Sequence, residues 1–118
     1  MTSSPLVYIV VLNWNGWNDT IECIESCLKL TYPLYRILIV DNGSTDGSVL
    51  KLRERFHGID ILQTGRNLGF AGGNNVGIRH ALNQGADYIW LLNNDTIVDP
   101  SALGELVNAA QANNIIGI

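Results

Sequence analysis

Short apolar runs alternate with segments of helical periodicity along the chain, and this alternation restricts the fold more than any other feature of the sequence. The runs are rich in β-branched and aromatic residues and have the length of strands: Leu6–Leu12, Tyr35–Val40, Ile59–Leu62 and Tyr88–Leu92. Strand–helix repeats with short connections require right-handed crossovers and a mainly parallel sheet. The sequence therefore predicts an α/β fold, a three-layer α/β/α sandwich with a mostly parallel sheet, in a single domain over residues 1–118.

Helices are expected between and after these runs. Apolar residues at helical spacing share one face in three segments: Trp17, Ile21, Ile24 and Leu28; Val49, Leu52 and Phe56; Leu103, Leu106, Val107 and Ala110. We expect another helix over about Ala71–Asn83, closed by Gly85, and helix caps at Asp46 and Asp99. Ile115–Ile118 predicts the start of a fifth strand, so we expect the chain to be the front part of a longer domain.

The composition excludes several classes of protein. Because 47% of the residues are hydrophobic and 15% are charged, we expect a folded chain. The net charge is −4 and the seven Lys and Arg residues do not cluster, which argues against a nucleic-acid partner. No apolar run has membrane-spanning length and the first residues do not resemble a signal peptide, so the expected location is the cytoplasm. Cys23 and Cys27 are interpreted as buried thiols.

Each predicted strand is followed by polar residues. In chain order, the polar segments after the four strands are Asn13–Gly16, Asp41–Gly47, Thr64–Asn75 and Asn93–Asp95. The last of these follows Tyr88–Leu92, a run without polar alternation that predicts a strand buried on both faces. In open α/β sheets, ligands bind outside the carboxyl ends of the strands. The sequence therefore predicts a ligand or metal site at this edge, although turns alone also favour Asn and Asp.

Several of these residues have two interpretations on local sequence alone. Asp41 is either a turn residue that binds the backbone of Gly43 or Ser44, or a carboxylate that accepts hydrogen bonds from a nucleotide base or ribose. Arg66 is either a solvated loop cation or a contact to phosphate or base. The glycines of the third polar segment allow either tight helix packing or close approach of a ligand: Gly69, Gly72 and Gly73.

Other nucleotide- and phosphate-binding folds do not fit the motifs. A dinucleotide-binding domain needs its glycine fingerprint after the first strand, where this chain has only Gly16. No Walker sequence ending in Gly-Lys-Ser/Thr is present. A phosphate-accepting receiver domain needs an acidic pair after the first strand, where this chain has Asn13 and Asn15.

Four motifs in a fixed order resemble those of family 2 glycosyltransferases with the GT-A fold, and within these the rhamnosyltransferase-like branch. The motifs are Val10–Gly16, Val40–Asp46, Asn67–Asn75 and Leu92–Thr96. The resemblance covers nearly the whole chain. It implies that residues 1–118 are the nucleotide-sugar-binding half of a GT-A domain.

The resemblance also implies a donor site and a divalent cation, Mg²⁺ or Mn²⁺. By position, Asn13 lies by the base and ribose, Asp41 contacts the base, and Asp95 is the metal ligand. The other expected substrate-binding residues are Asn15, Asn42, Ser44, Arg66, Asn67, Gly72, Asn75, Asn93 and Asn94. Asn93 departs from the Asp-x-Asp pattern of the family, so it offers a neutral amide where an acid is usual.

The family reaction is an inverting transfer of a sugar from a nucleotide-diphosphate sugar to a saccharide or lipid-linked acceptor. The catalytic base of such enzymes belongs to the second half of the fold, and neither Asp99 nor Glu105 suits that role, so the base is expected beyond residue 118. The isolated chain is then inactive and prone to self-association, and the full protein is expected at the cytoplasmic face of a membrane. The alternatives are a non-catalytic nucleotide or sugar-nucleotide-binding domain and a structural α/β domain with turn-rich edges.

Overall fold

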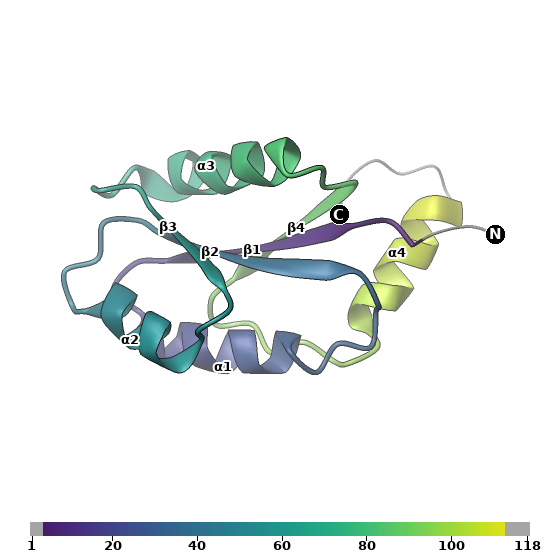
Figure 1. Cartoon of the computed structure of the whole chain (residues 1–118), viewed down its shortest axis with the longest axis horizontal. Coiled ribbons are helices and arrows are strands. Elements are labelled where there is room, and N and C mark those ends of the chain that lie inside the picture. Colours follow the sequence, from purple (N-terminus) through teal and green to yellow (C-terminus); the bar gives the residue numbers. More distant parts are fainter. Residues whose placement is uncertain (1–3, 113–118) are drawn as a thin grey trace.

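The computed structural model describes residues 4–112 as three layers around a parallel sheet (Figure 1). The elements are β1 (Val7–Asn13), α1 (Trp17–Cys27), β2 (Tyr35–Asp41), α2 (Ser48–Arg55), β3 (Asp60–Gln63), α3 (Gly69–Asn83), β4 (Tyr88–Asn93) and α4 (Ala102–Ala112). The four strands pair in the order β3-β2-β1-β4, and every pair is parallel. The predicted α/β sandwich is confirmed.

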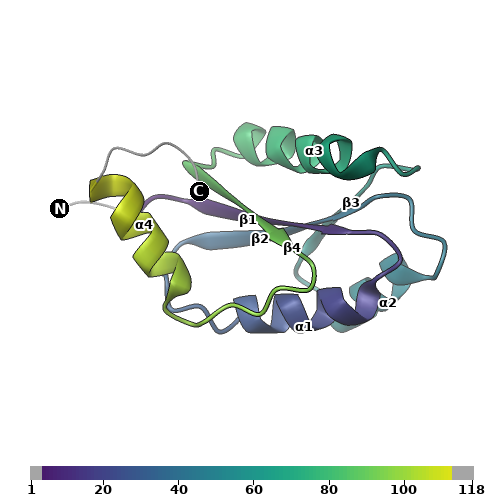
Figure 2. The same ribbon diagram turned by 180° about the vertical axis from the view of Figure 1, so that it is seen from behind.

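Each face of the sheet buries its own apolar cluster. Alternate β1 and β2 residues such as Ile9 and Ile39 pack with α1, α2 and α4 in the larger cluster, in which Leu103 and Val107 represent α4. The other face, including Val10 and Leu38, packs beneath α3 (Figure 2). Because β1 and β2 are buried on both faces over most of their length, they form the centre of the core. No helix among residues 4–112 is long and apolar enough to cross a membrane.

Two glycines bring α3 unusually close to the sheet. A Cβ at Gly77 would lie 2.5 Å from Val10 Cγ1, and one at Gly73 would lie 2.6 Å from Leu12 Cδ1. The helix therefore needs glycine at these positions in order to pack as it does. It begins at Gly69, two residues before the predicted start, and ends before Gly85, whose φ of +85° is the expected left-handed cap.

The structure corrects the interpretation of Tyr88–Leu92. We expected a strand buried on both faces, but only Leu92 is buried in β4, because β4 lies at one edge of the sheet among the described residues. At the start of α2, Gly47 rather than Asp46 occupies the cap position, although the Asp46 carboxylate accepts a hydrogen bond from Ser48 N at 3.0 Å. The predicted fifth strand, 115–118, lies outside the described residues.

All four strands extend one residue further at their carboxyl ends than the apolar pattern indicated, and the added residues are polar. Asn13, Asp41 and Asn93 are each the last residue of a strand. The order of the strands also reverses at β1, since β2 and β3 lie on one side of it and β4 on the other. Such a reversal is the usual place for a ligand in an open α/β sheet.

Candidate functional site

The register of the sheet brings the polar strand ends together. Asn13 pairs with Asp41 across β1 and β2, and Leu12 pairs with Asn93 across β1 and β4. Residues more than 70 positions apart in the chain therefore lie together at the carboxyl ends of the strands, which we call the carboxyl edge of the sheet. Because all strands are parallel, each of these ends opens to the same side.

Asn13 is completely buried, and both ends of its amide are bonded within the protein. Its Nδ2 donates to Asp41 Oδ1 at 2.9 Å and lies 3.3 Å from Ser44 Oγ. Its Oδ1 accepts the hydroxyl proton of Thr20 at 2.6 Å. Asn13 therefore acts on this site through its neighbours, since no part of its side chain reaches solvent.

Asp41 is 3% exposed and accepts three hydrogen bonds from its surroundings. Oδ1 accepts from Asn13 and from the Ser44 hydroxyl at 2.7 Å, and Oδ2 accepts from Ser44 N at 3.0 Å. The turn predicted for Asp41 and Ser44 is therefore present. A carboxylate has about four lone-pair positions, so one on Oδ2 remains for a ligand.

Asn15 joins the loop after β1 to the loop after β2. Its backbone N–H donates to Ser44 Oγ at 2.9 Å, and its Oδ1 accepts from Thr45 N at 2.7 Å. Asn15 has a φ of +48°, a conformation that Asn tolerates better than most residues. The two loops thus form one bonded unit, from which Trp14 projects with 53% of its surface exposed.

Asn42 holds the loop between β3 and α3. Its Nδ2 donates to Gly69 O at 3.0 Å and to Asn67 Oδ1 at 3.2 Å, while its Oδ1 accepts from Leu68 N at 3.0 Å. Gly43 packs so closely on this loop that a Cβ there would lie 2.5 Å from the carbonyl carbon of Arg66. The backbone around Arg66 is therefore fixed relative to β2.

The remaining residues of the third motif differ in exposure. The side chains of Arg66, Asn67 and Asn75 are exposed, and Gly72 is half-buried. Arg66 has no ion-pair partner among the residues that the structure describes. Asn74, which the sequence did not single out as a site residue, is buried at 5% exposure.

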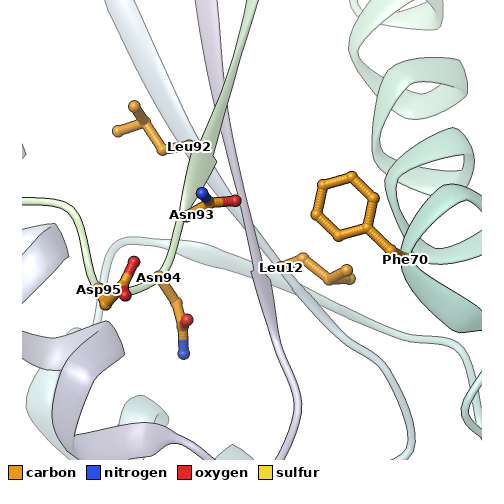
Figure 3. A pocket seen from close by; sticks show the side chains of 6 residues that line it. All are labelled: Leu12, Phe70, Leu92, Asn93, Asn94 and Asp95. Atoms are coloured by element: carbon orange, nitrogen blue, oxygen red, sulfur yellow. The ribbon is translucent and has the colours of Figure 1, made fainter.

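A pocket of about 270 Å³ opens beside the ends of β1 and β4 (Figure 3). Its lining combines three polar residues with three apolar ones: Asn93, Asn94 and Asp95, and Leu12, Leu92 and Phe70. Phe70, at the start of α3, is 68% exposed and faces the strand ends across the pocket. The amide of Asn94 points away from Phe70 and bonds to α1, with Nδ2 3.2 Å from Thr20 Oγ1.

Asp95 fits a divalent cation that also binds a phosphorylated ligand. Its carboxylate is exposed and accepts no hydrogen bond from residues 4–112. No group of three or more His, Cys, Asp or Glu side chains forms a metal cage within this part of the chain. Mg²⁺ commonly binds one or two carboxylates plus substrate phosphates, and Asn93 and Asn94 add further oxygen atoms beside Asp95. The donor set therefore suits Mg²⁺ or Mn²⁺ held jointly with a ligand.

The two cysteines lie beneath this loop and are buried, free thiols, as expected. Cys23 Sγ lies 3.8 Å from the carbonyl oxygen of Asn93. Their mutual hydrogen bond is the largest influence on both thiols, and it lowers the pKa of Cys23 and raises the pKa of Cys27, with burial adding to the rise. We therefore interpret the pair as part of the packing that supports Asn93.

Comparison with known proteins identifies the family of the chain. The sequence profile described as glycosyl transferase family 2 matches residues 8–118. The glycosyltransferase GlyG of Streptococcus pneumoniae is 31% identical over 112 residues, which cover 92% of this chain and 36% of that relative. The galactofuranosyltransferase GlfT1 of Mycobacterium tuberculosis is 43% identical over 99 residues, which cover 80% of this chain and 31% of that relative. The chain thus spans about a third of the length of these relatives.

Solved structures share the fold at low sequence identity. A mannosyltransferase from Pyrobaculum calidifontis, in complex with GDP-Man and Mn²⁺, superposes with a TM-score of 0.78 and 21% identity, over 93% of this chain and 32% of that one. Residues 1–349 of S. aureus TarS, in complex with UDP-GlcNAc, give a TM-score of 0.79 and 19% identity, over 92% and 32%. The fold is GT-A, and the chain belongs to glycosyl transferase family 2.

Proposed function

We propose that this chain binds a nucleoside diphosphate sugar, the donor of a sugar transfer, at the carboxyl edge of its sheet together with Mg²⁺ or Mn²⁺. The observation that carries the proposal is the position of two carboxylates, Asp41 and Asp95, at strand ends on either side of β1. Between them the order of the strands reverses. The similar proteins solved with GDP-Man and UDP-GlcNAc support a donor of this chemical class.

The two carboxylates have different tasks in this proposal. The unused lone pair of Asp41 accepts a hydrogen bond from the base or ribose, while Asn13, Asn15 and Ser44 hold that carboxylate in place. Asp95 and the diphosphate oxygens together bind the cation, which when bound stabilises negative charge on the leaving diphosphate. Arg66 extends from a fixed backbone toward solvent and contributes positive charge for the phosphates or the base.

In the longer protein, the proposed reaction is an inverting transfer by direct displacement to a saccharide or lipid-linked acceptor, at the cytoplasmic face of a membrane. The motifs resemble the rhamnosyltransferase-like branch, whereas a relative with 43% identity is a galactofuranosyltransferase. Donors of both kinds therefore belong in any test. The base that deprotonates the acceptor is proposed to lie outside this chain, because Asp99 caps α4 and Glu105 lies on that helix's exposed side.

NMR mapping of the ¹⁵N-labelled chain tests the donor site. Sugar nucleotides of UDP, GDP and dTDP, including rhamnose and galactofuranose donors, are added with and without Mg²⁺. We expect amide shifts around Asp41, Ser44 and Asn93–Asp95 for at least one nucleotide. A second pocket of about 290 Å³ lies at the opposite edge of the sheet, between Tyr35 and Asp60. Shifts confined to that pocket, or no shifts with any donor, would contradict the proposal.

A further inference from the structure

A continuous series of hydrogen bonds joins the two carboxylate-bearing parts of the site. Asn94 Nδ2 donates to Thr20 Oγ1 at 3.2 Å, and Thr20 Oγ1 donates to Asn13 Oδ1 at 2.6 Å. Asn13 Nδ2 then donates to Asp41 Oδ1 at 2.9 Å. The series therefore connects the residue before Asp95 with Asp41 through α1 and β1, and it does so inside the protein.

The charge of Asp41 fixes the direction of every bond in this series. An ionised carboxylate only accepts, so Asn13 must turn its Nδ2 toward Asp41 and its Oδ1 toward Thr20. The single hydroxyl proton of Thr20 is then committed to Asn13. Thr20 Oγ1 consequently accepts from Asn94, which orients that amide as well. One arrangement of donors and acceptors satisfies all four residues.

Burial makes this arrangement costly to change. Thr20 and Asn13 have no exposed surface, so water cannot replace a missing partner for either side chain. Within residues 4–112, loss of the Thr20 hydroxyl would leave Asn13 Oδ1 without a side-chain donor. The Asn94 amide would keep, in the same part of the chain, its 3.4 Å contact with Gly16 O. The position of the loop that carries Asp95 therefore depends on Thr20.

We propose that Thr20 is a positioning residue of the donor site, which sets the Asp95 loop relative to Asp41 so that one ligand meets both. This inference rests on the proposed donor function. Thr20 touches neither ligand nor cation, because it is buried. It acts through Asn94 on the metal side and through Asn13 on the nucleoside side, and it is the one member of the series that belongs to a helix.

The test compares Thr20→Val, which keeps the shape but removes the hydroxyl, with Thr20→Ser, which keeps the hydroxyl. The probe is whichever of UDP, GDP and dTDP binds the parent chain most tightly, and the readout is the ratio of its dissociation constants without and with saturating Mn²⁺. We expect Thr20→Val to reduce this ratio about two- to tenfold, the effect of one lost hydrogen bond, and Thr20→Ser to restore it. Ser48→Ala is the control, because it removes another fully buried hydroxyl, which bonds to Asp46 rather than to the loop that carries Asp95.

An unchanged ratio in Thr20→Val, or an equal reduction in Ser48→Ala, would overturn the inference. If the parent chain binds none of UDP, GDP and dTDP, the proposed function fails, and ligand-free NMR then tests Thr20 by itself. There we expect Thr20→Val to shift the backbone amide of Asp95 and the side-chain amide of Asn13.

If Thr20→Val does not fold, Asn94→Ala replaces it, because it breaks the same series at a half-buried residue. An unshifted Asn13 side-chain amide would then contradict the series.

Discussion

Buried amides and exposed charges have separate tasks at the carboxyl edge of the sheet. Asn13 and Asn42 use their oxygen and nitrogen atoms within the protein, and they fix the loops on which other residues lie. Asp95 and Arg66 are exposed and have no such partners among residues 4–112. Asp41 combines both tasks, because it accepts three bonds from its own surroundings and keeps one lone pair for a ligand.

Replacement of Asp41 by Ala is expected to weaken nucleotide binding with or without metal. The reason is the loss of a charge-assisted hydrogen bond to the nucleoside, which corresponds to about 1.5–3 kcal/mol. Asp46→Ala is the control, since Asp46 lies in the same loop and its carboxylate accepts bonds from Ser48 alone among the described residues. Titration calorimetry at a temperature where both variants are folded gives the affinities. Equal affinities in parent and Asp41→Ala would leave Asp41 with its turn role alone.

The close contact between α3 and the sheet gives a prediction for a helix. Gly77→Ala should destabilise the protein by about 1–3 kcal/mol, because its Cβ would lie 2.5 Å from Val10 Cγ1 in a packed core. Gly104→Ala in α4 is the matched control, because the added Cβ would meet no atom within 4 Å from other parts of residues 4–112, and it should stabilise by up to about 1 kcal/mol. Urea unfolding measures both changes. Equal effects would show that α3 does not need its glycine.

The start of α4 gives a pH-dependent prediction. Hydrogen bonds from the backbone N–H and hydroxyl of Ser101 lower the pKa of Asp99 below its ordinary value of 3.8. Because the folded-state pKa is the lower one, ionised Asp99 stabilises the folded state above pH 3.8, and this contribution is lost as the pH falls through the lowered pKa. Asp99→Asn keeps a capping oxygen without the charge. We expect the difference in Tm between parent and variant to shrink below pH 3.8, whereas a constant difference would contradict the assignment.

The periodicity of apolar residues predicted the helices and strands, because it reports which side chains are buried. It did not predict the ends of the strands or their order in the sheet, because both depend on which strands pair. The polar Asn13, Asp41 and Asn93 were assigned to loops, since an apolar pattern stops before the backbone pairing does. The edge position of β4 was also missed, because an apolar run does not reveal its neighbours. Thr20 was overlooked because a lone Thr within a helical pattern gives no signal. Only the meeting of β1, α1 and the β4 loop gives it partners.

At the scale of the whole molecule, we expect donor binding and sugar transfer to separate. The chain spans about a third of its relatives' length, and a missing general base commonly costs about 10²–10⁴-fold in rate. If the acceptor site belongs to the proposed second half of the fold, the positioning of the two reactants is lost as well. The purified 118-residue chain should therefore bind a sugar nucleotide but transfer no sugar to a panel of saccharide and lipid-linked acceptors. Sustained transfer would require a base among Asp95, Asp99 and Glu105.

Asp95 is proposed to bind a divalent cation jointly with a nucleoside diphosphate, and calorimetric titration measures this coupling. UDP, GDP and dTDP are titrated into the parent chain and into Asp95→Asn, each with and without Mn²⁺. We expect Mn²⁺ to strengthen binding of at least one nucleotide to the parent, and Asp95→Asn to lose this gain while it keeps its metal-free affinity. The same response to Mn²⁺ in both proteins would leave Asp95 a turn residue without a metal-binding role.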